Sequence, residues 1–184
     1  MTTALFFLVW GLATALALPL LLPFHARGIE GVRAFTVANA LAVLSLLAYA
    51  SADLVPPSLY VMVSNAAWLA AMSLVYVGVR QFFGLRPHAR RAAVAAAVGI
   101  LAMALMLYAT DNLVGRMTLF SGYTCVLMGA TGRVVYRQRQ RIQTPGVMLY
   151  VMLSMFGLAA LSALRAVVYL SLIHISEPTR RRGI

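Results

Sequence analysis

The chain has 184 residues, of which 62% are hydrophobic and only 10% are charged, and its mean hydropathy is +0.89. Soluble domains carry about 25% charged residues, so this composition excludes an ordinary soluble domain and predicts a membrane protein with several spans. The net charge of +11 would suggest nucleic-acid binding in a soluble protein, but here the arginines lie in short connections between apolar runs, so nucleic acid is not an expected partner.

Six apolar runs predict an all-α, polytopic transmembrane helix bundle, with six spans present of an expected seven. About 20 helical residues cover the roughly 30 Å of membrane hydrocarbon. The clearest run follows Pro56 and Pro57 and has no charged residue before Arg80. The absence of a charge before His25 favours a first span over a signal peptide. The predicted spans are residues 3–24, 34–52, 59–79, 92–108, 117–135 and 146–169.

Arginines concentrate in alternate connections, which orients the predicted bundle. By the positive-inside rule the connections 25–33, 82–91 and 137–144 are predicted to be cytoplasmic. These connections and the adjoining span ends hold one acidic residue, Glu30, and ten arginines: Arg27, Arg33, Arg80, Arg86, Arg90, Arg91, Arg133, Arg137, Arg139 and Arg141. The other connections hold Asp53, Asp111 and Arg116, so the N-terminus is predicted to lie outside. A seventh span would be needed to return the chain to the cytoplasm.

The last fifteen residues differ in composition from the rest of the chain. They contain three isoleucines, as many as the preceding 169 residues together. The segment from Leu170 to Arg180 resembles, residue for residue, the translation of a transposon-based sequencing adapter. We therefore expect residues 170–184 to be a non-native tail. The alternative is a genuine basic tail that binds anionic lipid.

No arrangement of side chains in the sequence is typical of catalysis. Cys125 lies inside an apolar run, where a small buried core residue is expected. The spans contain no paired carboxylates, metal-ligand spacing, Ser/His/Asp set or phosphate-binding glycine loop. We therefore predict no catalytic, cofactor-binding or metal-binding residue in this chain.

The candidate intramembrane polar site consists of Arg165, Asp53, Asp111, Asn39 and Asn65. An arginine inside a span costs a few kcal/mol unless it is paired or reaches water. Arg165 is therefore expected to face the bundle interior and to pair with Asp53 or Asp111, forming a pocket that could receive a signal. The alternative is that Arg165 extends to the outer headgroups and that the two asparagines hydrogen-bond neighbouring helices.

Two adjoining runs carry a resemblance to a known family. GVRAFTVANALAVLSLLAYA (31–50), a Pro-rich turn and LYVMVSNAAWLAAMSLVYVGVRQFFG (59–84) resemble the N-terminal membrane region of bacterial diguanylate cyclases of the GGDEF class. The resemblance covers residues 3–169. It implies an input region in the bacterial inner membrane, ahead of a cytoplasmic domain that joins two GTP into cyclic di-GMP. Mg and GTP are implied as cofactors of that domain only.

The chain departs from this family in having no Gly-Gly-Asp/Glu-Glu-Phe signature, no seventh span and no soluble domain. A reading frame interrupted near Tyr169 would explain all three departures. One alternative is the input region of another signalling protein, such as a histidine kinase. Another is a small transporter, although the midspan Gly/Pro breaks of transporters are not seen. The expected partners are the lipid bilayer, an unidentified small-molecule or membrane signal, and a second copy of the chain.

Overall fold

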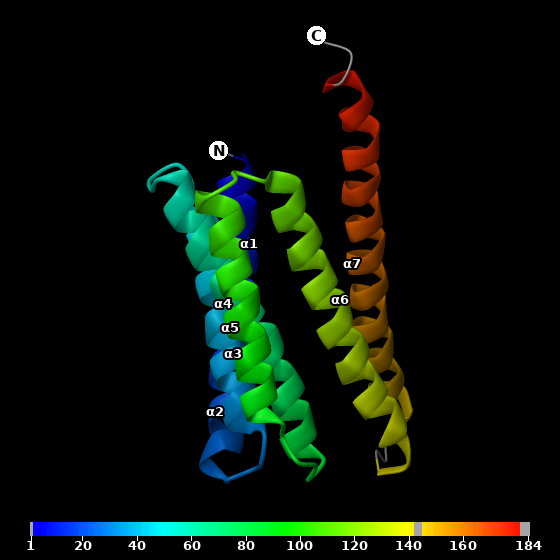
Figure 1. Ribbon diagram of the computed structural model, residues 1–184. Coiled ribbons are helices and arrows are strands. Elements are labelled where there is room, and N and C mark those ends of the chain that lie inside the picture. Colours follow the sequence, from blue (N-terminus) through cyan, green and yellow to red (C-terminus); the bar gives the residue numbers. More distant parts are fainter. Residues whose placement is uncertain (1, 142–144, 181–184) are drawn as a thin grey trace.

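The computed structural model describes residues 2–141 and 145–180, and this part of the chain contains helices and no strands (Figure 1). The predicted all-α class is therefore confirmed for the described residues. In chain order the elements are α1 (Thr2–Ala15), α2 (Ala17–Ala26), α3 (Val32–Ala50), α4 (Pro57–Phe82), α5 (Ala89–Tyr108), α6 (Leu113–Arg137), the 3-10 turn η1 (Arg139–Arg141) and α7 (Pro145–Arg180). The α7 helix thus includes residues 170–180 of the expected tail.

Among the described residues, four helical segments are long and apolar enough to cross a membrane, which supports a membrane protein. They are Val32–Ala50, Pro57–Phe82, Ala89–Tyr108 and Leu149–Ser171, and they correspond to α3, α4, α5 and the middle of α7. The predicted span 117–135 is helical in α6, which is less apolar because it carries Arg116, Arg133 and Arg137. The predicted span 3–24 is divided between α1 and α2.

A proline explains why the first predicted span is divided. The first helix ends at Ala15 and the second begins at Ala17. Pro19 lacks the amide hydrogen that would bond the carbonyl of Ala15, and its ring would collide with that carbonyl in a regular helix. The helix is therefore interrupted at Leu16, and the apolar helical stretch Leu5–Leu21 is shorter than the other four.

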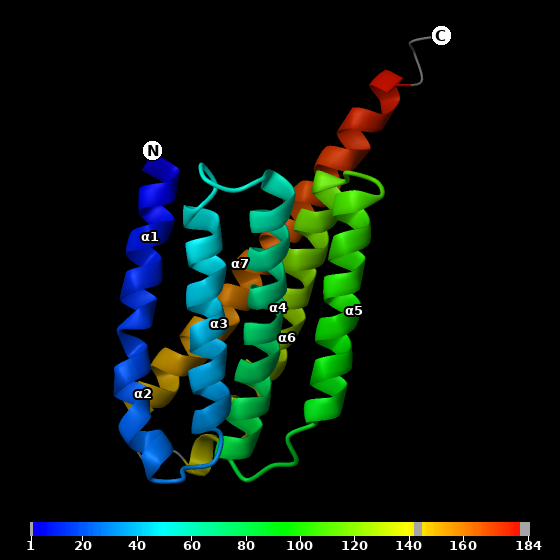
Figure 2. The ribbon, with the colours of Figure 1, turned by 90° about the vertical axis from the view of Figure 1, so that its left-hand side faces the viewer.

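Helix α4 lies at the centre of the bundle, in contact with α3, α5 and α6. Ten of its residues are buried, compared with three in α3 and four in α5. Figure 2 shows α3, α4 and α5 side by side, with α1 beside α3 and with α6 and α7 behind them. The last helix packs mainly on α6. The core therefore forms where α4 meets its three neighbours.

Small hydroxyl side chains bring the helices close together in this core. Ser73, Thr124 and Thr131 are buried, and each donates a hydrogen bond to the carbonyl four residues earlier in its own helix, at 2.7–2.9 Å. Such residues allow close backbone approach and keep their polar atoms satisfied in an apolar environment. The hydroxyl of Ser73 also lies 2.5 Å from that of Tyr123, which joins α4 to α6.

The closest backbone approach links the start of α3 to the end of α4. Gly31 precedes α3 in the left-handed region, at φ 85°, and Gly78 lies opposite it on α4. A Cβ atom at Gly31 would overlap the carbonyl oxygen of Gly78 and lie 2.9 Å from the amide nitrogen of Phe82. Glycine is required at position 31 because both its backbone conformation and the space around it exclude a side chain.

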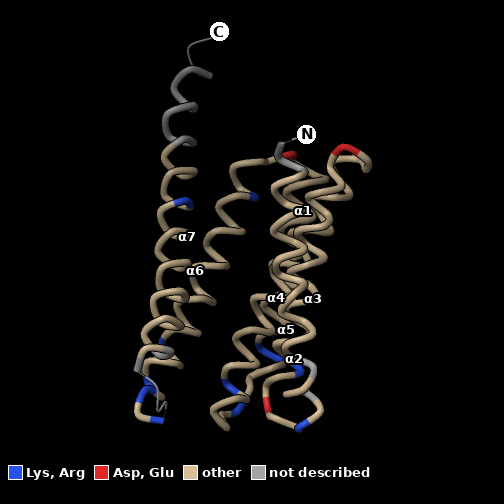
Figure 3. The backbone as a smooth tube through the Cα atoms, turned by 180° about the vertical axis from the view of Figure 1, so that it is seen from behind, with Lys and Arg blue, Asp and Glu red and all other residues tan. Residues whose placement is uncertain are grey.

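The two ends of the bundle differ in charge (Figure 3). Most arginines lie at one end, in the connections 27–31, 83–88 and 138–141 and the adjoining helix ends, and we call this the arginine-rich end. The opposite end contains the start of α1 and the connections 51–56 and 109–112, and we call it the N-terminal end. It carries both described aspartates.

Replacing Gly31 by alanine should destabilise the protein more than replacing Gly28. Gly28 also has a positive φ, of 67°, but no atom lies within 4 Å of its Cβ position. Gly28→Ala should therefore cost about 1 to 2 kcal/mol of left-handed strain. Gly31→Ala should cost about 1 to 3 kcal/mol more through overpacking. Unfolding in mixed micelles followed by circular dichroism measures both losses, and equal losses would contradict the close approach.

Candidate functional site

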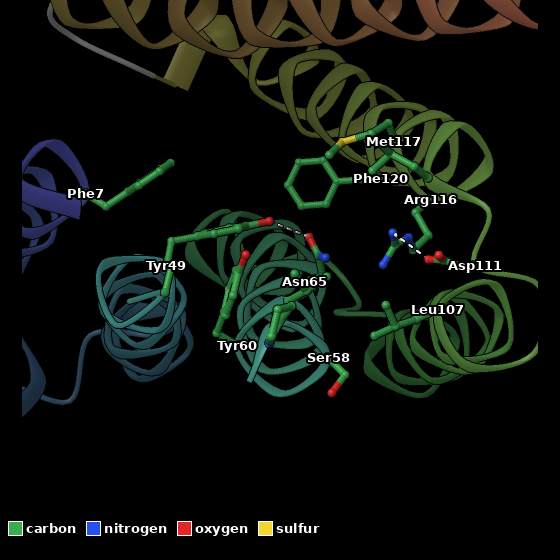
Figure 4. Close-up of a pocket in the computed structure, with 14 residues that line it drawn as sticks. Phe7, Tyr49, Ser58, Tyr60, Asn65, Leu107, Asp111, Arg116, Met117 and Phe120 are labelled. Carbon is green, nitrogen blue, oxygen red and sulfur yellow. Dashed lines mark hydrogen bonds and ion pairs between the residues drawn. The ribbon is translucent and has the colours of Figure 1, made fainter. Parts of the chain in front are cut away.

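A cavity of about 620 Å³ lies at the N-terminal end of the bundle, and we call it the end pocket (Figure 4). Residues from α1, α3, α4, α5 and α6 line it, together with Asp111 from the connection before α6. Its volume falls within the range of about 300–1,000 Å³ typical of small-molecule sites. The labelled side chains in Figure 4 include four aromatic rings: Phe7, Tyr49, Tyr60 and Phe120.

A second cavity of about 340 Å³, which we call the recess, shares walls with the end pocket. The shared residues are Phe7, Tyr49, Asn65, Met117 and Phe120. The recess adds Trp68 from α4 and Arg165 from α7. The two cavities therefore form neighbouring parts of one candidate site that involves six helices.

The structure brings Asn65 into this site and leaves Asn39 outside it. Asn65 is buried on α4, and its side-chain oxygen accepts a hydrogen bond of 3.2 Å from the hydroxyl of Tyr49. The side-chain amide of Asn39 donates a 3.1 Å bond to the carbonyl of Thr14, which joins α3 to α1. Both asparagines thus make interhelical hydrogen bonds, as the alternative interpretation predicted.

Arg165 lines the recess, but its neighbours are not the aspartates that the sequence suggested. Its Nη2 atom lies 3.0 Å from the sulfur of Met117, and its guanidinium lies 5.8 Å from the ring centre of Phe120 and 5.7 Å from that of Tyr169. Arg165 therefore packs against α6 through the weak sulfur acceptor of Met117 and a cation–π contact with Phe120. The expected ion pair of Arg165 with Asp53 or Asp111 does not form.

Asp111 pairs with Arg116 instead, because Asp111 lies just before α6 and Arg116 lies in the first turn of that helix. The Nη2 atom of Arg116 is 3.6 Å from a carboxylate oxygen of Asp111. No other ion pair is present among the described residues. Asp53 is exposed in the connection between α3 and α4 and does not line either cavity.

Arg116 is the site residue that the sequence reasoning missed. The charge pattern predicts Arg116 in an outer connection, but the Asn112 side chain accepts a 2.8 Å bond from the amide of Gly115, and α6 begins at Leu113. Arg116 therefore lies in the first turn of a helix, four residues before Phe120 and on the same face. The N-cap pattern of Asn112 is the signal in the sequence that could have located it.

The arginine-rich end is held together by hydrogen bonds to backbone carbonyls. The Nε atom of Arg80 donates to the carbonyl of Arg86 at 2.6 Å, and Arg141 donates to the carbonyl of Phe83 at 3.2 Å. Partial loss of hydration, and then the charges of Arg80, Arg91 and Arg86, lower the pKa of His88 below its ordinary value. His88 is therefore neutral at pH 7, and the positive charge of this end comes from arginines.

The chain matches no protein-family model, no curated protein and no solved structure. Within the described residues, no three His, Cys, Asp or Glu side chains lie close enough together to hold a metal ion. The site is characterised instead by arginine, hydrogen-bond donors and aromatic walls. This chemistry suits binding of a small molecule.

Tyr49→Phe should destabilise the protein, because it removes the hydrogen bond to the buried side chain of Asn65. Leaving a buried acceptor unsatisfied costs about 1 to 3 kcal/mol. Tyr60→Phe is the matched control, since the Tyr60 ring packs 6.2 Å from that of Tyr49 and its hydroxyl has no partner in the described chain. Circular-dichroism unfolding should show a loss for Tyr49→Phe alone. A similar loss in both variants would contradict the assigned bond.

Proposed function

We propose that this chain is the membrane-embedded input region of a bacterial signalling protein, and that its parent is a diguanylate cyclase of the GGDEF class. The observation that carries the input role is the end pocket, a cavity of about 620 Å³ lined by five helices. The resemblance of residues 31–50 and 59–84 to the membrane regions of these cyclases supports the choice of parent. In this proposal the enzyme activity belongs to a domain outside the chain.

The proposed orientation has six spans in the bacterial inner membrane, with the N-terminus outside. The support for it is the concentration of arginines at one end of the bundle, which the positive-inside rule assigns to the cytoplasm (Figure 3). The end pocket then faces the exterior, where a signal arrives. The arginine-rich end faces the cytoplasm, where GTP is available to a cyclase domain.

Helix α6 is the proposed connection between the two ends. It is a continuous helix of 25 residues, with Arg116, Met117 and Phe120 at the end pocket and Arg137 at the arginine-rich end. A rigid element that contacts a ligand at one end can change its packing along its whole length. Its neighbour α7, which packs mainly on α6, would move with it.

The source gene tests the identity of the parent. Reading the gene past the codon of Tyr169 should reveal a seventh apolar run, followed by a Gly-Gly-Asp/Glu-Glu-Phe signature. The intact protein should then raise cyclic di-GMP when it is expressed in bacteria. A gene that encodes residues 171–184 contiguously, or that continues into a histidine kinase domain, would refute the cyclase proposal.

Cysteine labelling tests the proposed orientation. Single cysteines at positions 56 and 139 are introduced into a Cys125→Ser background, because Cys125 is the chain's own cysteine. A membrane-impermeant maleimide added to intact cells should label position 56 and leave position 139 unlabelled until the cells are opened. The reverse pattern would invert the topology and place the end pocket in the cytoplasm.

A further inference from the structure

Three hydrogen-bond donors on the walls of the end pocket and the recess lack a good acceptor. The Nε atom of Arg116 and the indole nitrogen of Trp68 are buried and have no hydrogen-bond partner among the described residues. The third donor is Arg165, whose guanidinium bonds only the sulfur of Met117 in the described structure. A thioether is a weak acceptor. Because buried polar groups are nearly always satisfied, the two buried donors, on Arg116 and Trp68, indicate a partner that binds at this position, and the exposed Arg165 can contribute to it.

The carboxylate of Asp111 does not compensate Arg116 fully. The Arg116 side chain is 11% exposed, whereas that of Asp111 is 89% exposed, and their closest atoms are 3.6 Å apart. A carboxylate so well hydrated gains little from an ion pair. The Arg116 guanidinium, which is largely buried at its Nε atom, has five N–H donors. It can therefore bind a second anion from the cavity side while Asp111 stays in water.

Aromatic rings provide flat apolar walls beside these donors. Phe7 stacks on Tyr49 with ring centres 5.0 Å apart, and Trp68 stacks on Phe120 at 6.1 Å. Together these rings join α1 to α3 and α4 to α6. Aromatic walls with a few polar groups are typical of sites that bind the apolar body of a small ligand and fix its orientation.

We propose that the end pocket and the recess bind an amphiphilic organic anion, with a carboxylate or phosphate group on Arg116 and an apolar body between the aromatic pairs. Arg165 and the indole nitrogen of Trp68 supply further donors in the recess. The inference rests on the proposed input function and specifies the chemical class of its signal. Such an anion is either a free aromatic acid or the headgroup of an anionic lipid, and both present the same acceptors.

Quenching of Trp68 fluorescence provides a direct binding assay. Trp10→Phe leaves Trp68 as the single tryptophan, because the chain has two. The full chain in phosphatidylcholine nanodiscs is titrated with 4-bromobenzoate, whose bromine quenches indole fluorescence, and with the neutral 4-bromobenzamide. We expect saturable quenching by the acid and weaker binding of the amide. Equal binding of the two probes, or no saturable quenching by the acid, would overturn the proposal.

Substitutions on one helix distinguish the site from general attraction to positive charge. Arg116→Gln should weaken 4-bromobenzoate binding by about tenfold or more, the usual effect of losing a charge-assisted hydrogen bond. Arg133→Gln makes the same change on the same helix at an exposed position of the arginine-rich end, and it should leave binding unchanged. Similar effects of the two substitutions would overturn the assignment to Arg116.

Asp111→Asn keeps the test decisive if Arg116→Gln fails to fold. Asp111 is exposed, so its replacement should leave the fold intact, and removal of a competing carboxylate should tighten binding by up to about fivefold. Weaker binding by this variant would contradict an anion on Arg116. Circular dichroism of each variant confirms that its helices are formed.

Nanodiscs that contain phosphatidylglycerol identify the source of the anion. If a lipid headgroup occupies the site, phosphatidylglycerol should compete and raise the apparent dissociation constant of 4-bromobenzoate. An unchanged constant would assign the site to a free acid. This assay uses the membrane chain alone, so a negative result would remove the ligand class without deciding the parent protein, which the source gene decides separately.

Discussion

Close packing around α4 is the constraint on which the rest of the bundle depends. Helices in hydrocarbon gain little from the hydrophobic effect, so they associate through van der Waals contact and hydrogen bonds, which small residues permit. Helix α4 meets α3 at Gly78, and its Leu69 packs against Gly99 of α5. Ser73 on the same helix contacts Tyr123 of α6. These contacts fix α3, α5 and α6 around one axis and so determine which side chains face the end pocket.

The end pocket forms where this close packing gives way to large aromatic side chains. Moving from the core towards the N-terminal end, the large side chains are first Trp68 and Phe120, and then Tyr49 and Tyr60. Neighbouring rings lie 5.0 to 6.2 Å apart between centres, and side chains of this size hold helix backbones further apart than small residues do. The cavity is therefore a consequence of residue size along α3, α4 and α6. Its position at the end of the bundle leaves it accessible without disturbing the core.

Apolar runs predicted the helices well, because a run of hydrophobic residues is a strong signal and the connections carry prolines, glycines and arginines. The break at Leu16 was also predictable, since Pro19 has no amide hydrogen to bond the carbonyl of Ala15 as a regular helix requires. The side chains that contact Arg165 could not be predicted in the same way. Topology places a residue at one end of a bundle, but its neighbours depend on how the helix is rotated about its axis, and that rotation is set by packing. Arg165 faces Met117 for this reason.

The two arginines of the N-terminal end differ in how the protein accommodates their charge. Arg165 is exposed on α7 and lies near the rings of Phe120 and Tyr169, so cation–π contacts stabilise its guanidinium. The Arg116 side chain is only 11% exposed, and its Nε atom is buried without a hydrogen-bond partner in the described chain. Desolvation of a charge in such a place costs several kcal/mol unless well-placed acceptors offset it. One exposed carboxylate at 3.6 Å is a poor acceptor. An apolar residue would fill the position of Arg116 at lower cost, so an explanation based on stability alone does not account for it. The proposed binding of an anion does account for it, because Arg116 would then gain in the complex the acceptors that it lacks in the free protein.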